Sequence, residues 1–286
     1  MSGTLYLVAT PIGNLEDMTF RAIRILKEVD LIAAEDTRNS IKLLNHFEID
    51  TPMTSYHEFN RFDKGRELVD KLLAGQSIAV ITDAGTPGIS DPGEVLVQMC
   101  HENGIVVVPV PGAVAGINAL VASGQKTGSF IFEAFLPSDK TDRKARREVL
   151  DKLKSETRTI ILYEAPHRLV RTLEQLAEVL GGERSISLCK ELTKKHENIY
   201  KTTIKEALEM FSGGEEPRGE YVLVIAGKSL EEIEKEKEQE REGIDVEAEL
   251  RSLIEQGYSR KDASKTVAER YGLNKKEVYA VSTTII

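Results

Sequence analysis

Acidic and small polar residues follow short apolar runs at two places in this 286-residue chain. Ile78–Thr82, rich in β-branched residues, is followed by Asp83-Ala84-Gly85-Thr86-Pro87, and Leu31–Ala34 is followed by Glu35-Asp36-Thr37-Arg38. Open α/β sheets bind ligands at the carboxyl ends of their strands, so both loops are candidate binding loops. Glycine allows a backbone to come close to a ligand, and Gly85 and Gly88 fit that use. A tight strand-to-helix turn is the simpler interpretation of the same spacing.

Alternating strands and helices are expected to position these loops. Short, continuously apolar strands are predicted at Leu5–Ala9, Leu31–Ala34, Ile78–Thr82 and Ile105–Pro109. Such runs, separated by helical patterns, indicate an α/β fold with a mostly parallel sheet covered on both faces. Two local expectations accompany this fold. Asp91 should cap a helix that has Pro92 at its first position, and Phe20 should belong to the apolar face of a helix ending near Val29.

A second α/β unit and a helical tail are expected after Gly124–Gly128. Four further strands are predicted, at Phe130–Phe135, Arg158–Tyr163, Ser185–Cys189 and Tyr221–Ala226. The predicted division is an N-terminal α/β domain over residues 1–125, a second α/β domain over 126–228, a charged linker over 229–242 and a three-helix module over 243–286. Ser259–Asp262 has the pattern of a capping box. The module suits either a helix-turn-helix unit or a packing module.

Composition excludes several classes of protein. A net charge of −9 argues against coating nucleic acid by bulk electrostatics, although Lys140–Arg147 carries five cations and a single aspartate. Cys100 and Cys189 are far apart and the five histidines lack ligand spacing, so neither a disulfide framework nor a metal site is expected. No apolar run is long enough for a membrane span and no signal peptide is visible, which predicts a cytoplasmic protein.

Common catalytic motifs are missing from the chain. It has no phosphate-binding P-loop, no dinucleotide fingerprint after Leu5–Ala9 and no nucleophile elbow. Asp83-Ala84-Gly85-Thr86 is superficially similar to an aspartyl-phosphatase loop, but that chemistry needs a second acid where Gly85 stands.

Five motifs in order resemble the tetrapyrrole-methylase superfamily, and most closely its ribosomal RNA small subunit methyltransferase I branch. They are Thr10-Pro11-Ile12-Gly13-Asn14, Ala34-Glu35-Asp36-Thr37-Arg38, Asp83-Ala84-Gly85-Thr86-Pro87 with Ser90-Asp91-Pro92-Gly93, Val110-Pro111-Gly112, and Tyr163-Glu164-Ala165-Pro166-His167-Arg168. The resemblance spans about Thr4–Gly227. It implies two α/β domains with S-adenosylmethionine in the cleft between them, and a homodimer.

The resemblance also implies an activity and a cofactor site. The activity is methylation of the ribose 2′-hydroxyl of a cytidine in the decoding region of 16S ribosomal RNA, within the small ribosomal subunit. The implied cofactor-binding residues match the family motifs by position: Pro11, Asp83, Ala84, Gly85, Thr86, Ile89, Ala113, Val114, Ala115, Tyr163, Glu164, Ala165, Leu192, Ala226 and Gly227. Ala226 is also consistent with an ordinary buried residue of a strand that does not touch the cofactor.

Catalytic and RNA-binding residues are less sharply indicated. A ribose hydroxyl is a weak acid, so a general base would assist transfer. The candidates are Glu35, Asp36, His57, Glu58, Glu164 and Lys190, and the sequence does not choose among them. Glu35 and Asp36 also suit a helix start or an ion pair with Arg38, and His57 a surface histidine. Phosphate contacts are predicted at Arg38, Arg61, Lys140, Arg143, Lys144, Arg146, Arg147, Arg168, Lys275 and Lys276. A solvated helix face is the simpler interpretation of the basic run.

Two other functions fit the same motifs. The first is a methylase of a corrin or porphyrin precursor, against which stand Thr86 in place of an acid and the added C-terminal module. The second is a non-catalytic ribosome-binding protein that retains the cofactor fold. The sequence does not identify the nucleotide, the general base, the role of the C-terminal helices or the oligomeric state.

Overall fold

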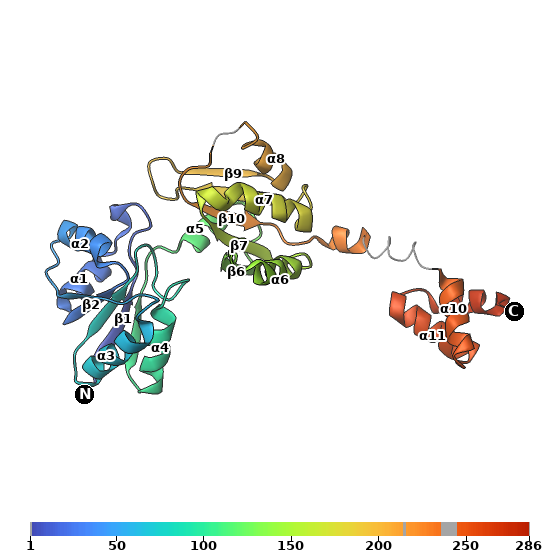
Figure 1. Cartoon of the computed structure of the whole chain (residues 1–286), viewed down its shortest axis with the longest axis horizontal. Coiled ribbons are helices and arrows are strands. Elements are labelled where there is room, and N and C mark those ends of the chain that lie inside the picture. Colours follow the sequence, from blue (N-terminus) through green and yellow to red (C-terminus); the bar gives the residue numbers. More distant parts are fainter. Residues whose placement is uncertain (1, 214–215, 236–244, 286) are drawn as a thin grey trace. The chain divides into compact units, whose positions relative to one another are not determined.

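Two five-stranded sheets and a group of C-terminal helices make up the chain (Figure 1). The structure is a computed structural model that describes residues 2–213, 216–235 and 245–285. The chain divides into two compact units, residues 1–227 and 228–286, and the first contains both sheets. The predicted α/β class with C-terminal helices is confirmed. The finer boundary between residues 125 and 126 stays a prediction.

The first sheet is parallel throughout, in the strand order β3-β2-β4-β1-β5. Successive side chains of its strands point alternately into two hydrophobic cores, one on each face of the sheet. Helices α1 and α2 pack on one face through Leu26 and Leu44, and α3 and α4 pack on the other through Leu68 and Leu96. The elements are β1 (Thr4–Val8), η1 (Leu15–Asp17), α1 (Phe20–Glu28), β2 (Leu31–Ala34), α2 (Thr37–His46), β3 (Met53–Ser55), α3 (Arg61–Leu73), β4 (Ile78–Ile81), α4 (Gly93–Glu102), β5 (Val106–Val110) and α5 (Ala115–Ala122).

Phe20 does not belong to the apolar face of α1, contrary to the expectation. Thr19 caps the helix by accepting a hydrogen bond of 3.0 Å from Ala22 N, and the buried face consists of Ala22, Ile25 and Leu26. Phe20 precedes Ala22 by two residues, which is about 200° around a helix. Its side chain is therefore 95% exposed.

Asp91 closes a loop instead of capping α4, so that expectation was also wrong. The helix begins at Gly93 with Pro92 as its N-cap. The Asp91 carboxylate accepts backbone hydrogen bonds of 2.8 Å from both Gly88 and Gly93. A Cβ on Gly93 would lie 2.8 Å from Gly88 N, so the loop closes this tightly only around glycine.

The second sheet is mixed, in the strand order β6-β7-β10-β8-β9. β6 and β7 are parallel, whereas β10 runs antiparallel to both of its neighbours. The start of β10 therefore meets the ends of β7 and β8, with Tyr221 opposite both Glu164 and Lys190. The elements are β6 (Phe130–Phe135), α6 (Arg143–Leu153), β7 (Thr159–Glu164), α7 (Pro166–Leu180), β8 (Ser185–Lys190), β9 (Asn198–Thr203), α8 (Ile204–Glu209) and β10 (Tyr221–Ile225).

Two strands lie where no strand was predicted. β3 has three residues and follows Pro52, and three residues are too few to show a period of two. β9, with the sequence NIYKTT, is a sheet edge that pairs with β8 alone. Its polar composition suits an edge strand that meets water, and such a strand has no continuous apolar signal.

The C-terminal unit contains α10 (Val246–Glu255), α11 (Arg260–Tyr271) and α12 (Lys275–Thr284) around its own core. Ser259 caps α11 by accepting from Asp262 N at 3.1 Å. The Asp262 carboxylate accepts from the Ser259 hydroxyl, so only half of the predicted capping box forms. Residues 236–242 of the predicted linker, and 243, 244 and 286 of the predicted module, lie outside the described residues. None of the described helices is long and apolar enough to cross a membrane.

Candidate cofactor cleft and its rim

Three loops of the first sheet are joined at its carboxyl edge. Thr10 and Gly85 exchange backbone hydrogen bonds of 2.9 and 3.2 Å, which tie the loop after β1 to the loop after β4. The Thr86 hydroxyl donates to the carbonyl of Ala113 at 3.1 Å and adds the loop before α5. The φ of Gly85 is +91°, a value that favours glycine. The three loops therefore form one wall at this edge.

A cavity of about 530 Å³ lies against this wall, and the second sheet supplies its other side. Eleven of the predicted cofactor residues line it: Asp83, Ala84, Gly85, Thr86, Ile89, Val114, Ala115, Tyr163, Glu164, Ala165 and Leu192. Tyr163 is fixed in place because its hydroxyl accepts from Gly116 N at 3.0 Å, and burial raises its pKa. The cavity has the size of a small-molecule site.

The other four predicted cofactor residues do not line the cavity. Pro11 is buried beside Ile12, which does line it, and Ala113 contributes only the carbonyl that Thr86 holds. Ala226 and Gly227 lie at the other end of the strands, next to the first residues of β7 and β8. Ala226 N donates to Ser185 O at the start of β8, and a Cβ on Gly227 would lie 2.1 Å from Thr157 O. Because β10 runs antiparallel to β7 and β8, its last residues lie beside the first residues of those strands, away from the cavity.

The residues at the start of β10 line the cavity, where Ala226 and Gly227 at its end were expected. Glu220, Tyr221 and Val222 line the cavity, and so does Cys189 at the end of β8. Burial raises the pKa of the Cys189 thiol to about 12, so the thiol stays protonated near neutral pH. The sequence held no signal for these residues, because strand direction within a mixed sheet is not visible in composition or periodicity.

Five carboxylates stand in the mainly apolar lining of the cavity. Glu35, Asp83 and Asp91 face it from the first sheet, and Glu164 and Glu220 from the second. No lysine or arginine is among the described residues that line it. Glu164 pairs with Arg168 at 3.1 Å and Glu220 with Lys194 at 3.0 Å. The negative charge at the cavity therefore comes mainly from Glu35, Asp83 and Asp91, and it favours a ligand that carries positive charge.

Two of the six general-base candidates line the cavity, Glu35 and Glu164. Glu35 Oε2 accepts from the Thr82 hydroxyl at 2.5 Å and lies 3.4 Å from Asp83 N. These contacts hold the carboxylate at the end of β2. Within the described chain no hydrogen bond is made to Glu35 Oε1, which leaves that oxygen available to a ligand.

Glu164 is held on all sides by protein donors. Its carboxylate accepts hydrogen bonds from Ala165 N and, at 2.5 Å, from the Thr172 hydroxyl, and it forms an ion pair with Arg168 Nε at 3.1 Å. The residue is 2% exposed. A carboxylate that already engages two hydrogen-bond donors and a cation has little room left for a substrate hydroxyl. Glu164 is better suited to fixing the end of β7.

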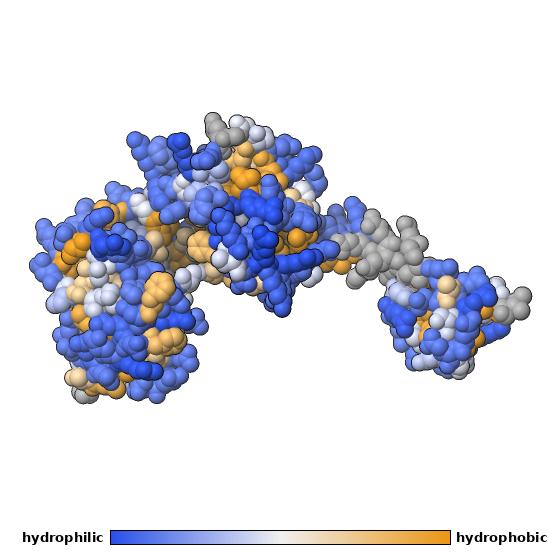
Figure 2. Space-filling model, viewed as in Figure 1, coloured by the Kyte–Doolittle hydropathy of each residue, from blue (hydrophilic) through white to orange (hydrophobic). Residues whose placement is uncertain are grey.

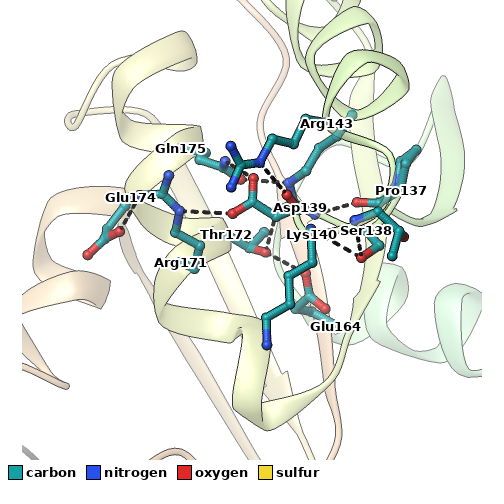
Figure 3. A network of polar contacts seen from close by, with 12 residues as sticks. Pro137, Ser138, Asp139, Lys140, Arg143, Glu164, Arg171, Thr172, Glu174 and Gln175 are labelled. Atoms are coloured by element: carbon teal, nitrogen blue, oxygen red, sulfur yellow. Dashed lines mark hydrogen bonds and ion pairs between the residues drawn. The ribbon is translucent and has the colours of Figure 1, made fainter.

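Glu164 belongs to a polar network between α7 and the loop after β6 (Figure 3). Thr172 and Gln175 project from α7 toward this loop, and Gln175 donates to Asp139 at 3.2 Å. Arg171 also contacts the Asp139 carboxylate, at 3.4 Å. The network therefore connects the cavity wall to Pro137–Lys140, the segment from which the basic helix α6 begins.

Arg146 lies inside this network, so its predicted role in binding RNA was wrong. Its side chain is 2% exposed. The guanidinium donates to Gln175 at 2.7 Å, to the Thr172 hydroxyl at 2.8 Å and to the Pro137 carbonyl at 3.0 Å. The run Arg143–Arg147 shows only that cations recur, whereas the helical period turns this single position toward the core.

The remaining base candidates do not line this cavity. Asp36 caps α2 and pairs with Arg38 at 2.7 Å, and this hydrogen bonding lowers the Asp36 pKa to about 2. Glu58 pairs with Arg61. His57 lies beside Phe59, and Lys190 lines a second cavity on the other side of Tyr221. The helix-start interpretation of Asp36 is therefore the correct one.

Comparison with known proteins identifies the family. A family model described as tetrapyrrole (corrin/porphyrin) methylases matches residues 4–208. A protein of Synechocystis sp. named ribosomal RNA small subunit methyltransferase I is 50% identical over 98% of this chain and 97% of its own length. The Bacillus subtilis protein of the same name is 46% identical over 97% and 93%. The chain belongs to the ribosomal RNA small subunit methyltransferase I family. The predicted resemblance is confirmed.

Solved structures extend the likeness in fold beyond this methyltransferase family. The uroporphyrin-III C-methyl transferase of Thermus thermophilus, complexed with S-adenyl homocysteine, is 18% identical with a TM-score of 0.55 over 78% of this chain and 97% of that chain. A conserved hypothetical protein of Aeropyrum pernix K1 is 16% identical with a TM-score of 0.62 over 99% and 96%. A protein of the tetrapyrrole-methylase fold therefore binds the demethylated form of the cofactor.

Proposed function

We propose that this chain transfers the methyl group of S-adenosylmethionine to the ribose 2′-hydroxyl of a cytidine in 16S ribosomal RNA, within the small ribosomal subunit. Membership in the methyltransferase I family supports the ribosomal substrate. The observation that carries the methyl-transfer chemistry is the cavity at the joined loops, which combines apolar groups with the carboxylates of Asp83 and Asp91. Because ribosomal subunits are its substrate, the protein works in the cytoplasm.

The cavity residues fit the cofactor. A Cβ on Gly85 would lie 3.3 Å from both Ala113 O and Ile12 Cγ2, and the φ of +91° would strain any other residue, so the wall is tightly packed around a glycine here. Apolar groups, among them Ile89, Val114 and Leu192, offer contacts to an adenosine. The carboxylates of Asp83 and Asp91 complement the positive charges of the sulfonium and the α-amino group.

The chain contributes alignment and proton transfer. The bound sulfonium supplies an already activated methyl group. Rigid placement of donor and acceptor then provides much of the rate. Tyr163, anchored to α5, and Gly85, anchored to Thr10, fix the two sides of the cavity. We assign the proton of the attacking hydroxyl to Glu35 Oε1, at the cavity wall.

RNA phosphates are assigned to exposed cations around the cavity and on the C-terminal unit. On α6, the side chains of Lys144 and Arg147 are 91% and 84% exposed, and their ion pairs with Glu148 and Asp151 are long, at 3.9 Å. Arg143, Lys140, Arg38, Arg61, Lys275 and Lys276 complete the set. Arg168 is the weakest member, because its guanidinium already holds Glu164 and the Leu136 carbonyl. Surface cations of this kind position the nucleic acid without reading its bases.

A homodimer is supported by apolar side chains that meet solvent. Val106 on β5, Ile117 and Val121 on α5 and Phe130 on β6 are between 38% and 67% exposed. β5 and β6 are edge strands of their sheets. Most of the visible surface is hydrophilic, with separate hydrophobic patches (Figure 2). Exposed apolar side chains at sheet edges are typical of surfaces that associate.

Methyl transfer from labelled S-adenosylmethionine tests the proposal. The acceptors are small subunits from cells that lack this protein, free 16S RNA and a porphyrinogen mixture. We expect label in subunit RNA, at one cytidine whose 3′ linkage becomes resistant to alkali. Label in the porphyrinogen alone would overturn the substrate, and cofactor binding without transfer to any acceptor would overturn the activity.

A further inference from the structure

Two phenylalanines near the carboxyl edge of the first sheet meet solvent without apparent structural use. Phe59, in the loop after β3, is 97% exposed, and Phe62, on the first turn of α3, is 53% exposed. Neither belongs to the core on this face of the sheet, which α3 joins through Leu68, Val69 and Leu72. The fold therefore does not account for aromatic rings at these positions.

The segment that carries them is fixed close to the cofactor cavity. The buried Tyr56 hydroxyl donates to Pro92 O at 2.9 Å, and the preceding residue, Asp91, lines the cavity. Asn60 holds the turn by accepting from His57 N at 2.8 Å and donating to Ser55 O at 3.3 Å. The Phe59 ring lies edge-on to His57, with centroids 6.1 Å apart. Phe59 thus stands on an ordered turn, which Tyr56 joins to the loop whose Asp91 lines the cavity, and Phe62 follows on α3.

Cations are interleaved with the rings. The Arg61 guanidinium lies 5.0 Å from the centroid of the Phe62 ring. Lys64 and Arg66 follow on α3, so residues 57–66 carry three cations against Glu58 and Asp63. Glu58 pairs with Arg61, and Asp63 with Arg66 at 3.7 Å. Lys64 pairs with Glu67 at 2.7 Å, so each of the three cations has an acidic partner and the charges of residues 57–67 balance. This balance contrasts with the negative charge of the chain as a whole.

We propose that Phe59 and Phe62 form a stacking platform for unpaired bases of the RNA next to the methylated nucleotide, with Arg61 beside them for the backbone. This inference rests on the proposed function and specifies how the substrate is held. Proteins bind unpaired nucleic acid through aromatic rings that stack bases and cations that follow the backbone. An acceptor ribose can enter the cavity only if its neighbours are unstacked, and exposed rings beside the cavity would compensate for that unstacking.

The test uses the full chain and two measurements. Fluorescence anisotropy with a 5′-labelled, unpaired 12-nucleotide RNA reports binding, and methylation of small subunits reports kcat and KM. We expect Phe59→Ala and Phe62→Ala each to weaken RNA binding and to raise KM by roughly tenfold, the scale of one lost base stack. The value of kcat and the calorimetric affinity for S-adenosylmethionine should not change.

Matched variants separate stacking from other causes. Phe20→Ala removes an equally exposed ring from α1, which packs on the other face of the sheet, and should leave both measurements unchanged. Phe59→Tyr should preserve binding, whereas Phe59→Leu should not. Full RNA binding by Phe59→Leu would show that an apolar contact, and not stacking on an aromatic ring, holds the RNA at this position, and would overturn the platform. Alanine variants with wild-type KM on subunits that the wild-type protein methylates would overturn it too, while leaving the proposed function intact.

Discussion

Arg146 shows how a single residue of a charged run can belong to the interior. It donates to Thr172, Gln175 and the Pro137 carbonyl, and removing it takes a donor away from all three acceptor oxygens. We expect Arg146→Ala to lower the free energy of unfolding by about 3 kcal/mol, the scale for breaking a buried polar network. Denaturant unfolding measures this loss.

Arg147 is the matched control for Arg146. It is the next residue on the same helix and is 84% exposed, with a distant partner in Asp151. Arg147→Ala should change the unfolding free energy by less than about 0.5 kcal/mol, as exposed ion pairs do. Equal losses for the two variants would contradict the assignment of Arg146 to the interior.

Glu35 is the residue on which the proposed proton transfer depends. Glu35→Gln keeps an oxygen for Thr82 and Asp83 N but abolishes the base. We expect kcat on small subunits to fall by about 10²- to 10⁴-fold, the usual contribution of a general base, with cofactor affinity nearly unchanged. Glu28→Gln, which removes an exposed acid paired with Arg24, serves as control and should retain full activity. Wild-type kcat for Glu35→Gln would assign the proton elsewhere.

At the scale of elements, the start of α2 depends on a charged cap. Asp36 accepts from Arg38 N at 2.8 Å and from the Arg38 side chain, and this hydrogen bonding lowers its pKa from 3.8 to about 2. A lowered pKa in the folded state stabilises the fold above pH 4, and this stabilisation is lost as the pH falls through about 2. Asp36→Asn keeps the cap but should remove this part of the acid sensitivity. Unfolding profiles between pH 2 and 6 compare the two proteins, and parallel profiles would contradict the prediction.

Sequence predicted the elements better than their directions. β4 and the loop after it were visible as an apolar run followed by Gly and Pro, because both features are local. β10 was equally visible as a strand, yet its antiparallel pairing with Tyr163 and Cys189 depends on partners distant in the chain. The same difference decides which of the predicted site residues lie at the cavity. Residues on parallel strand ends, such as Asp83 and Ala165, lie at the cavity, whereas Gly227 lies at the other end of the strands.

At the scale of the whole molecule, association can be tested on α5. Val121 is 67% exposed and makes no part of the described core. Val121→Asp would place a charge in the proposed dimer surface, where it would be buried without a partner. Sedimentation equilibrium should give a dimer for the wild type and a monomer for this variant, with similar melting temperatures. Leu73→Asp changes an exposed apolar residue on α3 and should remain a dimer. A monomeric wild type would refute the homodimer outright.

The separate core of the C-terminal unit leads to a prediction about coupling. Val267 is fully buried among Leu250, Ala263 and Val278, and every member of this cluster comes from residues 250–285. Val267→Ala should destabilise this unit by about 2 kcal/mol through the cavity that it creates. Hydrogen exchange should then accelerate in α10, α11 and α12 only.

The first unit supplies the control for this coupling. Its amides, among them those of β4 and β7, should exchange as in the wild type. The calorimetric affinity for S-adenosylmethionine should also be unchanged, because all residues that line the proposed cofactor cavity lie between Ile12 and Val222. RNA binding should weaken if Lys275 and Lys276 contact phosphates, since both lie on the destabilised α12. Loss of cofactor affinity in Val267→Ala would show that the two units fold as one, and the independence inferred from their separate cores would be wrong.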